Sequence, residues 1–158
     1  MEANCPPVQQ APAKNRLPNA TLTNDTQVAF GELIGLDLRG CSTGVAYARI
    51  EDAIADRFWG NPDVIRPSAK QCALALKFGF DIGAQSRAVG AAVVDDIMFQ
   101  LNMEAIENNR LAPGVRVRHK MDDLGRTMVV SSVSVNGTVY FKGGNGQKAW
   151  ARNLIRAE

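Results

Sequence analysis

Two stretches of the chain match without a gap: QVAFGELIGLDLRGCSTGVAYARIEDAI at residues 27–54 and QCALALKFGFDIGAQSRAVGAAVVDDIM at residues 71–98. At this offset of 44 residues eight positions are identical: Gln27/Gln71, Ala29/Ala73, Gly35/Gly79, Asp37/Asp81, Ser42/Ser86, Val45/Val89, Ala48/Ala92 and Asp52/Asp96. A period of this size indicates one supersecondary unit used twice. A duplicated unit without catalytic residues favours binding, because two weak contacts on one chain raise the effective concentration.

Each copy is expected to fold as a helix, an extended loop and a second helix. A capping box, in which a polar side chain and a glutamine three residues later satisfy free backbone donors, starts each first helix: Asn24 with Gln27, and Ser68 with Gln71. Gly35 and Gly79 lie where a left-handed residue ends the first helix. Serines then cap the second helices, at Ser42 and Ser86.

The second helix of each copy carries apolar residues at a spacing of three and four. This spacing predicts one apolar face per helix, formed by Tyr47, Ile50 and Ile54 in the first copy and by Ala91, Val94 and Met98 in the second. Trp59 and Trp150 are expected to be hydrophobic anchors, and Trp59, which follows the first copy, is expected to hold the two copies together.

The composition predicts a folded protein without a membrane segment. Of the 158 residues, 46% are hydrophobic and 22% are charged. No apolar run approaches the roughly 20 residues of a membrane helix, and Met1–Ala20 lacks the apolar core of a secretory signal. The three cysteines have no paired spacing, which argues against disulfides and structural zinc and favours a reducing, cytoplasmic setting.

The chain divides into four predicted parts. Residues 1–20 are a flexible Pro-rich arm, residues 21–66 and 67–110 are the two helix-loop-helix repeats, and residues 111–158 are a basic domain. The last part holds eight Lys and Arg against three Asp and Glu, a net charge of +5, whereas the whole chain has only +2. Such asymmetry indicates that the parts meet different partners.

Residues 111–158 have the two-residue periodicity of strands. Val115, Val117 and His119 alternate with basic residues, and Asn136-Gly137 is a strong hairpin signal because both residue types tolerate positive φ. Leu154-Ile155-Arg156 is expected to be the last strand, after a single helical turn. Four or five short strands in fewer than fifty residues predict a small barrel. The predicted fold class is α+β and multidomain, with two tandem helix-loop-helix repeats before a β-barrel.

The 44-residue unit resembles the SAP and helix-extended-loop-helix group over residues 24–100. The residues that carry the resemblance are the helix-ending glycines, the capping serines and the second helix with its Ile/Val-acid-acid pattern. The resemblance implies DNA binding, or protein binding as in relatives of the group. This chain has Glu51-Asp52 and Asp95-Asp96 where basic residues would help to contact phosphate.

Residues 111–158 are similar to SH3-like barrels of the Tudor/KOW type. The resemblance rests on Pro113–Val117, on the Asn136-Gly137 hairpin before Val139-Tyr140-Phe141, and on the closing Asn153–Arg156. Such barrels bind RNA, DNA or peptides, so the fold alone does not set the function.

Basic and aromatic residues of the barrel form the predicted nucleic-acid site. Its members are Arg116, Arg118, Lys120, Tyr140, Lys142, Lys148 and Arg152. Arg116, Arg118 and Lys120 are expected to share one face of the first strand, because side chains alternate along a strand. Cations release counterions from phosphates, and a flat ring stacks on a base. The alternative is a solvated face that keeps a small barrel soluble. The loop Gly143–Lys148 lacks the strand-loop-helix context and the Lys-Ser/Thr ending of a nucleotide loop, so a flexible barrel loop is the favoured interpretation.

Catalysis and metal binding are not expected. His119 is the only histidine and lacks partners with ligand spacing, and Cys41-Ser42 has no identifiable base beyond it. Adjacent acids on a helix point about 100° apart and are better explained as an exposed polar face.

Two function hypotheses remain open. The first is a non-enzymatic nucleic-acid-binding accessory protein that uses the basic SH3-like barrel, with either DNA or RNA as ligand. The second is an adaptor subunit that docks through its helical module and N-terminal arm on a larger nucleic-acid-processing effector complex. Neither hypothesis calls for a cofactor, a metal, a membrane or a small-molecule substrate.

Overall fold

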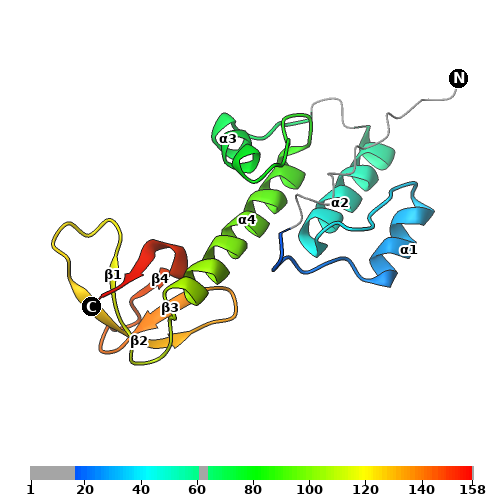
Figure 1. The fold of residues 1–158 in the computed structure, drawn as a ribbon. Coiled ribbons are helices and arrows are strands. Elements are labelled where there is room, and N and C mark those ends of the chain that lie inside the picture. The colour runs from blue at the N-terminus through cyan, green and yellow to red at the C-terminus, as the bar shows by residue number, and fades with distance from the viewer. Residues whose placement is uncertain (1–16, 61–63, 158) are drawn as a thin grey trace, which may run out of the picture.

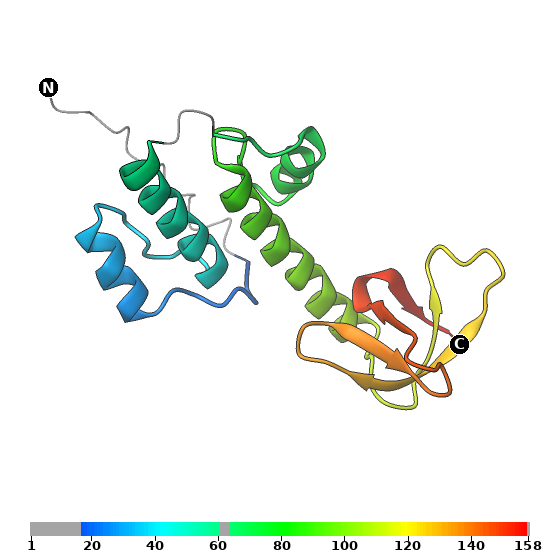
Figure 2. The ribbon, with the colours of Figure 1, turned by 180° about the vertical axis from the view of Figure 1, so that it is seen from behind.

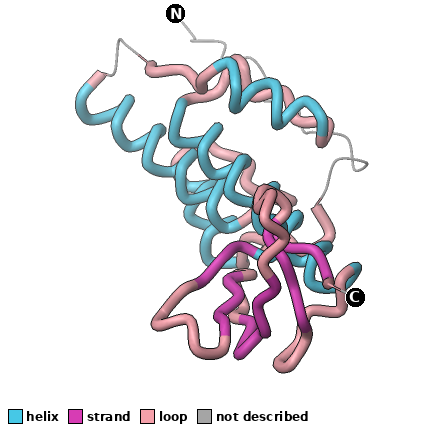
Figure 3. The backbone as a smooth tube through the Cα atoms, turned by 90° about the vertical axis from the view of Figure 1, so that its left-hand side faces the viewer, coloured by secondary structure: helices cyan, strands magenta, loops and turns pink. Residues whose placement is uncertain are grey.

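The computed structural model describes residues 17–60 and 64–157, and in them the chain is an α+β protein. The helices come first and the strands last, and Figure 3 shows the two kinds of element at separate ends of the molecule. The elements in chain order are α1 (Asp25–Leu33), α2 (Thr43–Trp59), α3 (Ala69–Lys77), α4 (Arg87–Asn108), β1 (Arg116–His119), β2 (Thr127–Val133), β3 (Thr138–Phe141), β4 (Lys148–Trp150), the 3-10 helix η2 (Ala151–Asn153) and β5 (Leu154–Arg156).

Both ends of α1 and α3, and the starts of α2 and α4, follow the 44-residue offset. α1 and α3 have nine residues each, and both begin with the predicted capping box, at Asn24 and at Ser68. The hydroxyl oxygens of Ser42 and Ser86 accept hydrogen bonds from backbone N–H groups three residues later, as predicted. Gly35 and Gly79 have φ of 81° and 82°, a left-handed conformation that favours glycine. These local features were predictable because each depends on only a few neighbouring residues.

α4 is the central element of the molecule. In Figure 1 and in Figure 2, α2 and α3 lie on opposite sides of its first half, and the sheet lies at its C-terminal end. Its residues Val89, Val93 and Ile97 belong to the helical core, whereas Ala105 belongs to the core of the sheet. One helix therefore packs in both hydrophobic cores, although the predicted domain division ends a repeat at residue 110.

The buried face of α2 differs from the predicted apolar stripe. Val45, Ala46 and Ala48 are the buried residues, whereas Tyr47 is 60% exposed. Val45 and Ala48 pack in the core that α4 also enters, where two helices approach closely, and Ala46 is buried outside that core. Trp59 is 77% exposed, so the prediction that it anchors the two copies together is wrong.

Part of the predicted N-terminal arm belongs to the helical core. Leu17 is buried in the cluster that includes Val93, and the backbone N–H of Asn19 donates to the Gln100 side chain at 3.0 Å. Residues 17–20 are therefore folded structure. Residues 1–16 lie outside the described residues.

The strands form one five-stranded antiparallel sheet in the order β4-β3-β2-β1-β5. β4 and β5 are its edges, and the described strands do not close into the predicted barrel. The predicted hairpin at Asn136-Gly137 joins β2 and β3, and the predicted last strand is β5. Val117, Val130, Val139 and Leu154 form the core of the sheet, and all are fully buried.

Asn102 joins α4 to the sheet. It is 2% exposed, and its side-chain amide donates to the Asn136 carbonyl oxygen at 3.3 Å. Its Oδ1 accepts from the backbone N–H of Arg152 at 3.3 Å and from the Arg152 guanidinium at 3.1 Å. A Cβ on Gly137 would lie 2.4 Å from the Asn102 Cβ, so only glycine allows this approach.

Candidate functional site

Arg116 and Arg118 lie on the outer face of β1. Both are exposed and flank Val117, which is fully buried, because successive side chains of a strand point to opposite faces. The prediction that Arg116 and Arg118 share one exposed face is therefore confirmed. Lys120 was expected to share that face, but β1 ends at His119. The Lys120 ammonium instead donates to the Arg152 carbonyl oxygen at 2.7 Å, so it stabilises the chain next to η2.

Lys142 lies in register with Arg116 across the sheet. Arg116 pairs with Val129 of β2, and the backbone N–H of Lys142 donates to the Val129 carbonyl oxygen at 2.9 Å. The two exposed cations therefore flank Val129, at about two strand spacings or roughly 10 Å from each other. Arg116 and Arg118 lie on β1 and Lys142 directly follows β3, so these three cations lie on both sides of β2 in one sheet.

An aromatic and basic pair lies on β3 and β4. Tyr140 is directly opposite Lys148, and Thr138 is opposite Trp150 two residues along, on the same face of the sheet. Tyr140 and Trp150 are therefore diagonal neighbours on one face, and such positions are about 7–8 Å apart. They are 38% and 41% exposed. We call Tyr140, Lys148 and Trp150 the aromatic patch.

Arg152 belongs to the joint between α4 and the sheet. Its guanidinium lies 5.1 Å from the centre of the Trp150 ring and donates to Asn102. Burial lowers the pKa of Arg152, but an arginine stays charged at physiological pH. Arg152 therefore places a fixed positive charge beside the aromatic patch, and its side chain is held by more contacts than those of the exposed lysines.

Sequence reasoning missed the position of Trp150. The residue was absent from the predicted site and was expected to be a hydrophobic anchor. The alternation of Lys148, Ala149 and Trp150 contains the missed signal, because a half-buried Ala149 between two exposed residues puts Lys148 and Trp150 on one face.

Within residues 17–60 and 64–157, the exposed cations of this surface form no ion pair with a carboxylate. Among residues 111–157 the described residues form one ion pair, between Arg126 and Asp122 at 3.1 Å. The hydrogen bond from Arg126 lowers the pKa of the Asp122 carboxyl. Arg116, Arg118, Lys142 and Lys148 remain available for an anionic ligand.

The other candidate side chains have structural roles. His119 Nδ1 accepts from the backbone N–H of Met121 at 3.1 Å, which fixes the turn after β1. The Arg49 guanidinium lies 3.5 Å from the Cys41 sulfur, and burial raises the pKa of the Cys41 thiol, partly offset by Arg49. Among the residues that the structure describes, no three His, Cys, Asp or Glu side chains lie together as a metal site.

The loop Gly143–Gln147 is a tight turn. The backbone N–H of Gln147 donates to the Gly144 carbonyl oxygen at 2.7 Å, and Asn145 is in the left-handed region with a φ of 46°. The loop therefore joins β3 to β4 as a hydrogen-bonded turn.

Comparison with known proteins gives no match: neither a protein-family model, nor a curated protein, nor a solved structure matches the chain. Within the described residues, no helix is both long and apolar enough to span a membrane.

Proposed function

We propose that the chain is a non-enzymatic nucleic-acid-binding accessory protein that uses the basic surface of its C-terminal sheet. The observation that carries the proposal is the aromatic patch, in which Tyr140 and Trp150 lie beside Lys148 and Arg152. Lys142, directly after β3, and Arg116 and Arg118 on β1 extend the positive charge across β2 to the other side of the sheet.

Each group has a distinct physical task in this proposal. Cations on the strands contact phosphates, and the counterions released from the nucleic acid supply the free energy. Exposed rings stack on bases, which contributes about 1–3 kcal/mol per base and tolerates any sequence. Stacking requires unpaired bases, so the aromatic patch favours a single-stranded DNA or RNA segment.

The finer fold assignment is part of the same proposal. The strand order β4-β3-β2-β1-β5, with η2 between β4 and β5, supports an SH3-like arrangement of Tudor/KOW type. The matched caps of α1 with α3 and of α2 with α4 support two SAP-like helix-extended-loop-helix repeats. In this arrangement the repeats assist, and the sheet makes the main contact.

Binding of labelled single-stranded DNA and RNA of mixed sequence tests the proposal. Arg116→Ala with Arg118→Ala should reduce the salt dependence of log K by about 0.7 for each lost phosphate contact to a single strand. Tyr140→Ala should weaken binding roughly tenfold with an unchanged salt slope, because it removes stacking and no charge.

Lys77→Ala is the matched control, since Lys77 is an exposed cation on α3, distant from the sheet in sequence and in fold. If the sheet variants fold and bind both nucleic acids as well as the control does, the contact is not on this surface.

An adaptor function is the second candidate, and one observation favours it. α1 and α2 leave an apolar pocket open between them, lined by residues such as Phe30 and Phe58. Under this alternative the helical module docks on a larger effector complex, and the sheet reaches the nucleic acid of that complex.

A further inference from the structure

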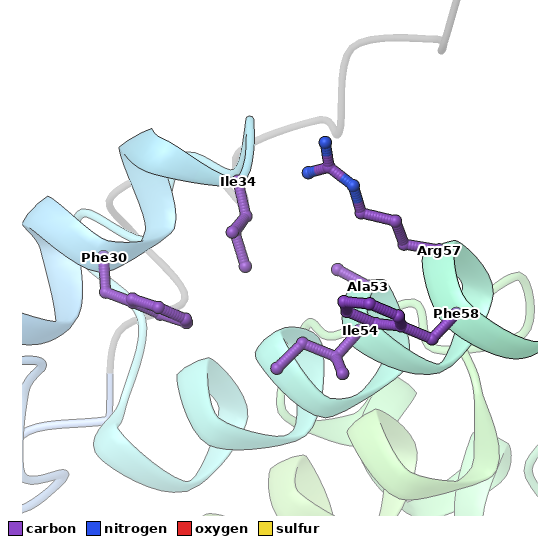
Figure 4. Close-up of a pocket in the computed structure, with 6 residues that line it drawn as sticks. All are labelled: Phe30, Ile34, Ala53, Ile54, Arg57 and Phe58. Carbon is purple, nitrogen blue, oxygen red and sulfur yellow. The ribbon is translucent and has the colours of Figure 1, made fainter.

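A pocket of about 390 Å³ lies between α1 and α2, far from the aromatic patch in the fold. Figure 4 shows Phe30 and Ile34 projecting from α1 toward the residues of α2. The lining is Phe30, Ile34, Ala53, Ile54, Arg57 and Phe58. Phe30 is 42% and Phe58 is 73% exposed, so large apolar side chains remain in contact with water. Contiguous exposure of this kind marks an interaction site.

In the second repeat, the space equivalent to this pocket is filled by side chains of that repeat. At the 44-residue offset, Phe30 and Ile34 correspond to Leu74 and Phe78, which pack against the helical core. Ala53 corresponds to Ile97, which is fully buried in that core. Ala53 has three carbon atoms fewer, so the floor of the first pocket is unfilled.

Arg57 marks the pocket with a positive charge. Its counterpart is Leu101, which packs against the helical core. Figure 4 shows the Arg57 side chain at the edge of the pocket, above Ala53. Among the described residues no hydrogen bond or ion pair holds its guanidinium, whereas Arg39 pairs with Glu32 nearby in the chain. An apolar pocket with one unpaired cation is complementary to a large apolar side chain next to a carboxylate.

We propose that this pocket binds an amphipathic helix of a partner protein that carries large apolar anchors and one Asp or Glu. The anchors, spaced at i, i+3 or i+4 and i+7, enter the groove between α1 and α2, and the carboxylate pairs with Arg57. The inference rests on the adaptor alternative and is independent of nucleic-acid binding by the sheet.

A displayed library of 16-residue helices tests this proposal. Leu, Ile, Met or Phe occupies the anchor positions, every residue type occupies the others, and the full-length protein is the target. Selection on the wild type should enrich Asp or Glu at one fixed position beside the anchors. Selection on Arg57→Glu should enrich Lys or Arg at that same position, because the charge of the site is reversed.

A synthetic peptide from the wild-type selection then measures affinity. Ala53→Ile fills the pocket floor as Ile97 does and should weaken binding roughly tenfold or more without lowering the melting temperature. Ala88→Ile is the matched control, because Ala88 is exposed on α4 outside the pocket. Arg116→Ala with Arg118→Ala should leave peptide binding unchanged, so failure here is distinguishable from failure of the nucleic-acid proposal.

Several outcomes overturn the proposal. The first is that the selection recovers no helix that binds. The second is that the selected peptide binds Ala53→Ile as tightly as the wild type. The third is that selection on the wild type enriches Lys or Arg beside the anchors. Concentration-dependent dimerisation of the protein that Phe58→Ala abolishes would assign the pocket to a second copy of the chain. Loss of nucleic-acid binding in Ala53→Ile would assign it to nucleic acid.

Discussion

Asn102→Ala should separate the helical part of the molecule from the sheet. The change removes the three hydrogen bonds through which α4 holds the hairpin and η2, at 3.1 to 3.3 Å. The Asn136 carbonyl and the Arg152 backbone N–H lose this partner, and each group left unsatisfied costs about 1–3 kcal/mol. The two groups together lower the free energy of unfolding by about 2–6 kcal/mol. At about 2–4 °C per kcal/mol for a chain of this size, the melting temperature falls by about 4–24 °C.

Calorimetry with hydrogen exchange measures this effect. The wild type should unfold in one transition, because α4 belongs to both cores. In Asn102→Ala the amides of the sheet should lose protection before those of α2 and α4. Asn108→Ala is the control, since Asn108 is exposed on the same helix. If the free energies of unfolding of the two variants differ by less than about 1 kcal/mol, Asn102 does not hold α4 to the sheet.

Two further predictions concern the helical core. Burial raises the pKa of Asp96 above its ordinary 3.8, the Ser42 hydrogen bond lowers it, and Asp95 raises it. The folded state thus binds the proton more tightly than the unfolded state, so this group destabilises the fold as pH rises above 3.8. Asp96→Asn should raise the melting temperature at pH 7, with the gain vanishing near pH 4; an equal gain at both pH values contradicts this reasoning. Leu17→Ala should cost roughly 2 kcal/mol or more in chemical unfolding, because Leu17 is 9% exposed in the core, and an unchanged midpoint would place residue 17 outside it.

Short-range patterns of the sequence predicted the element ends and the faces of β1. The caps at Asn24 and Ser68 depend on hydrogen bonds within four residues, so nothing distant alters them. The alternation around Val117 likewise follows from strand geometry alone. The same reasoning placed Arg116 and Arg118 on a common exposed face, and it fails at Lys120 because the strand ends one residue earlier.

Contacts between distant elements were not predictable in this way. The face of α2 that enters the helical core depends on where α4 lies, and a small residue such as Ala48 carries a weak hydrophobic signal. Asn102 is polar in a helix, and no local pattern indicates that the hairpin at Asn136 reaches it from 34 residues away. Leu17 lies in a stretch with Pro18 and no periodicity, so its burial depends wholly on the tertiary fold.

The different lengths of α2 and α4 explain why the first copy of the repeated unit has an open pocket where the second copy has a filled core. α2 ends at Trp59, where Gly60 caps it with a φ of 53°, whereas α4 continues to Asn108 and enters the core of the sheet. α4 is therefore packed along its length and has Ile97 and Leu101 in the helical core, where α3 also lies. α2 contributes Val45 and Ala48 to that core, whereas Ala53 and Arg57 line the pocket beside α1, outside it. Stability thus constrains the second copy at positions where the first copy is free to form a binding surface.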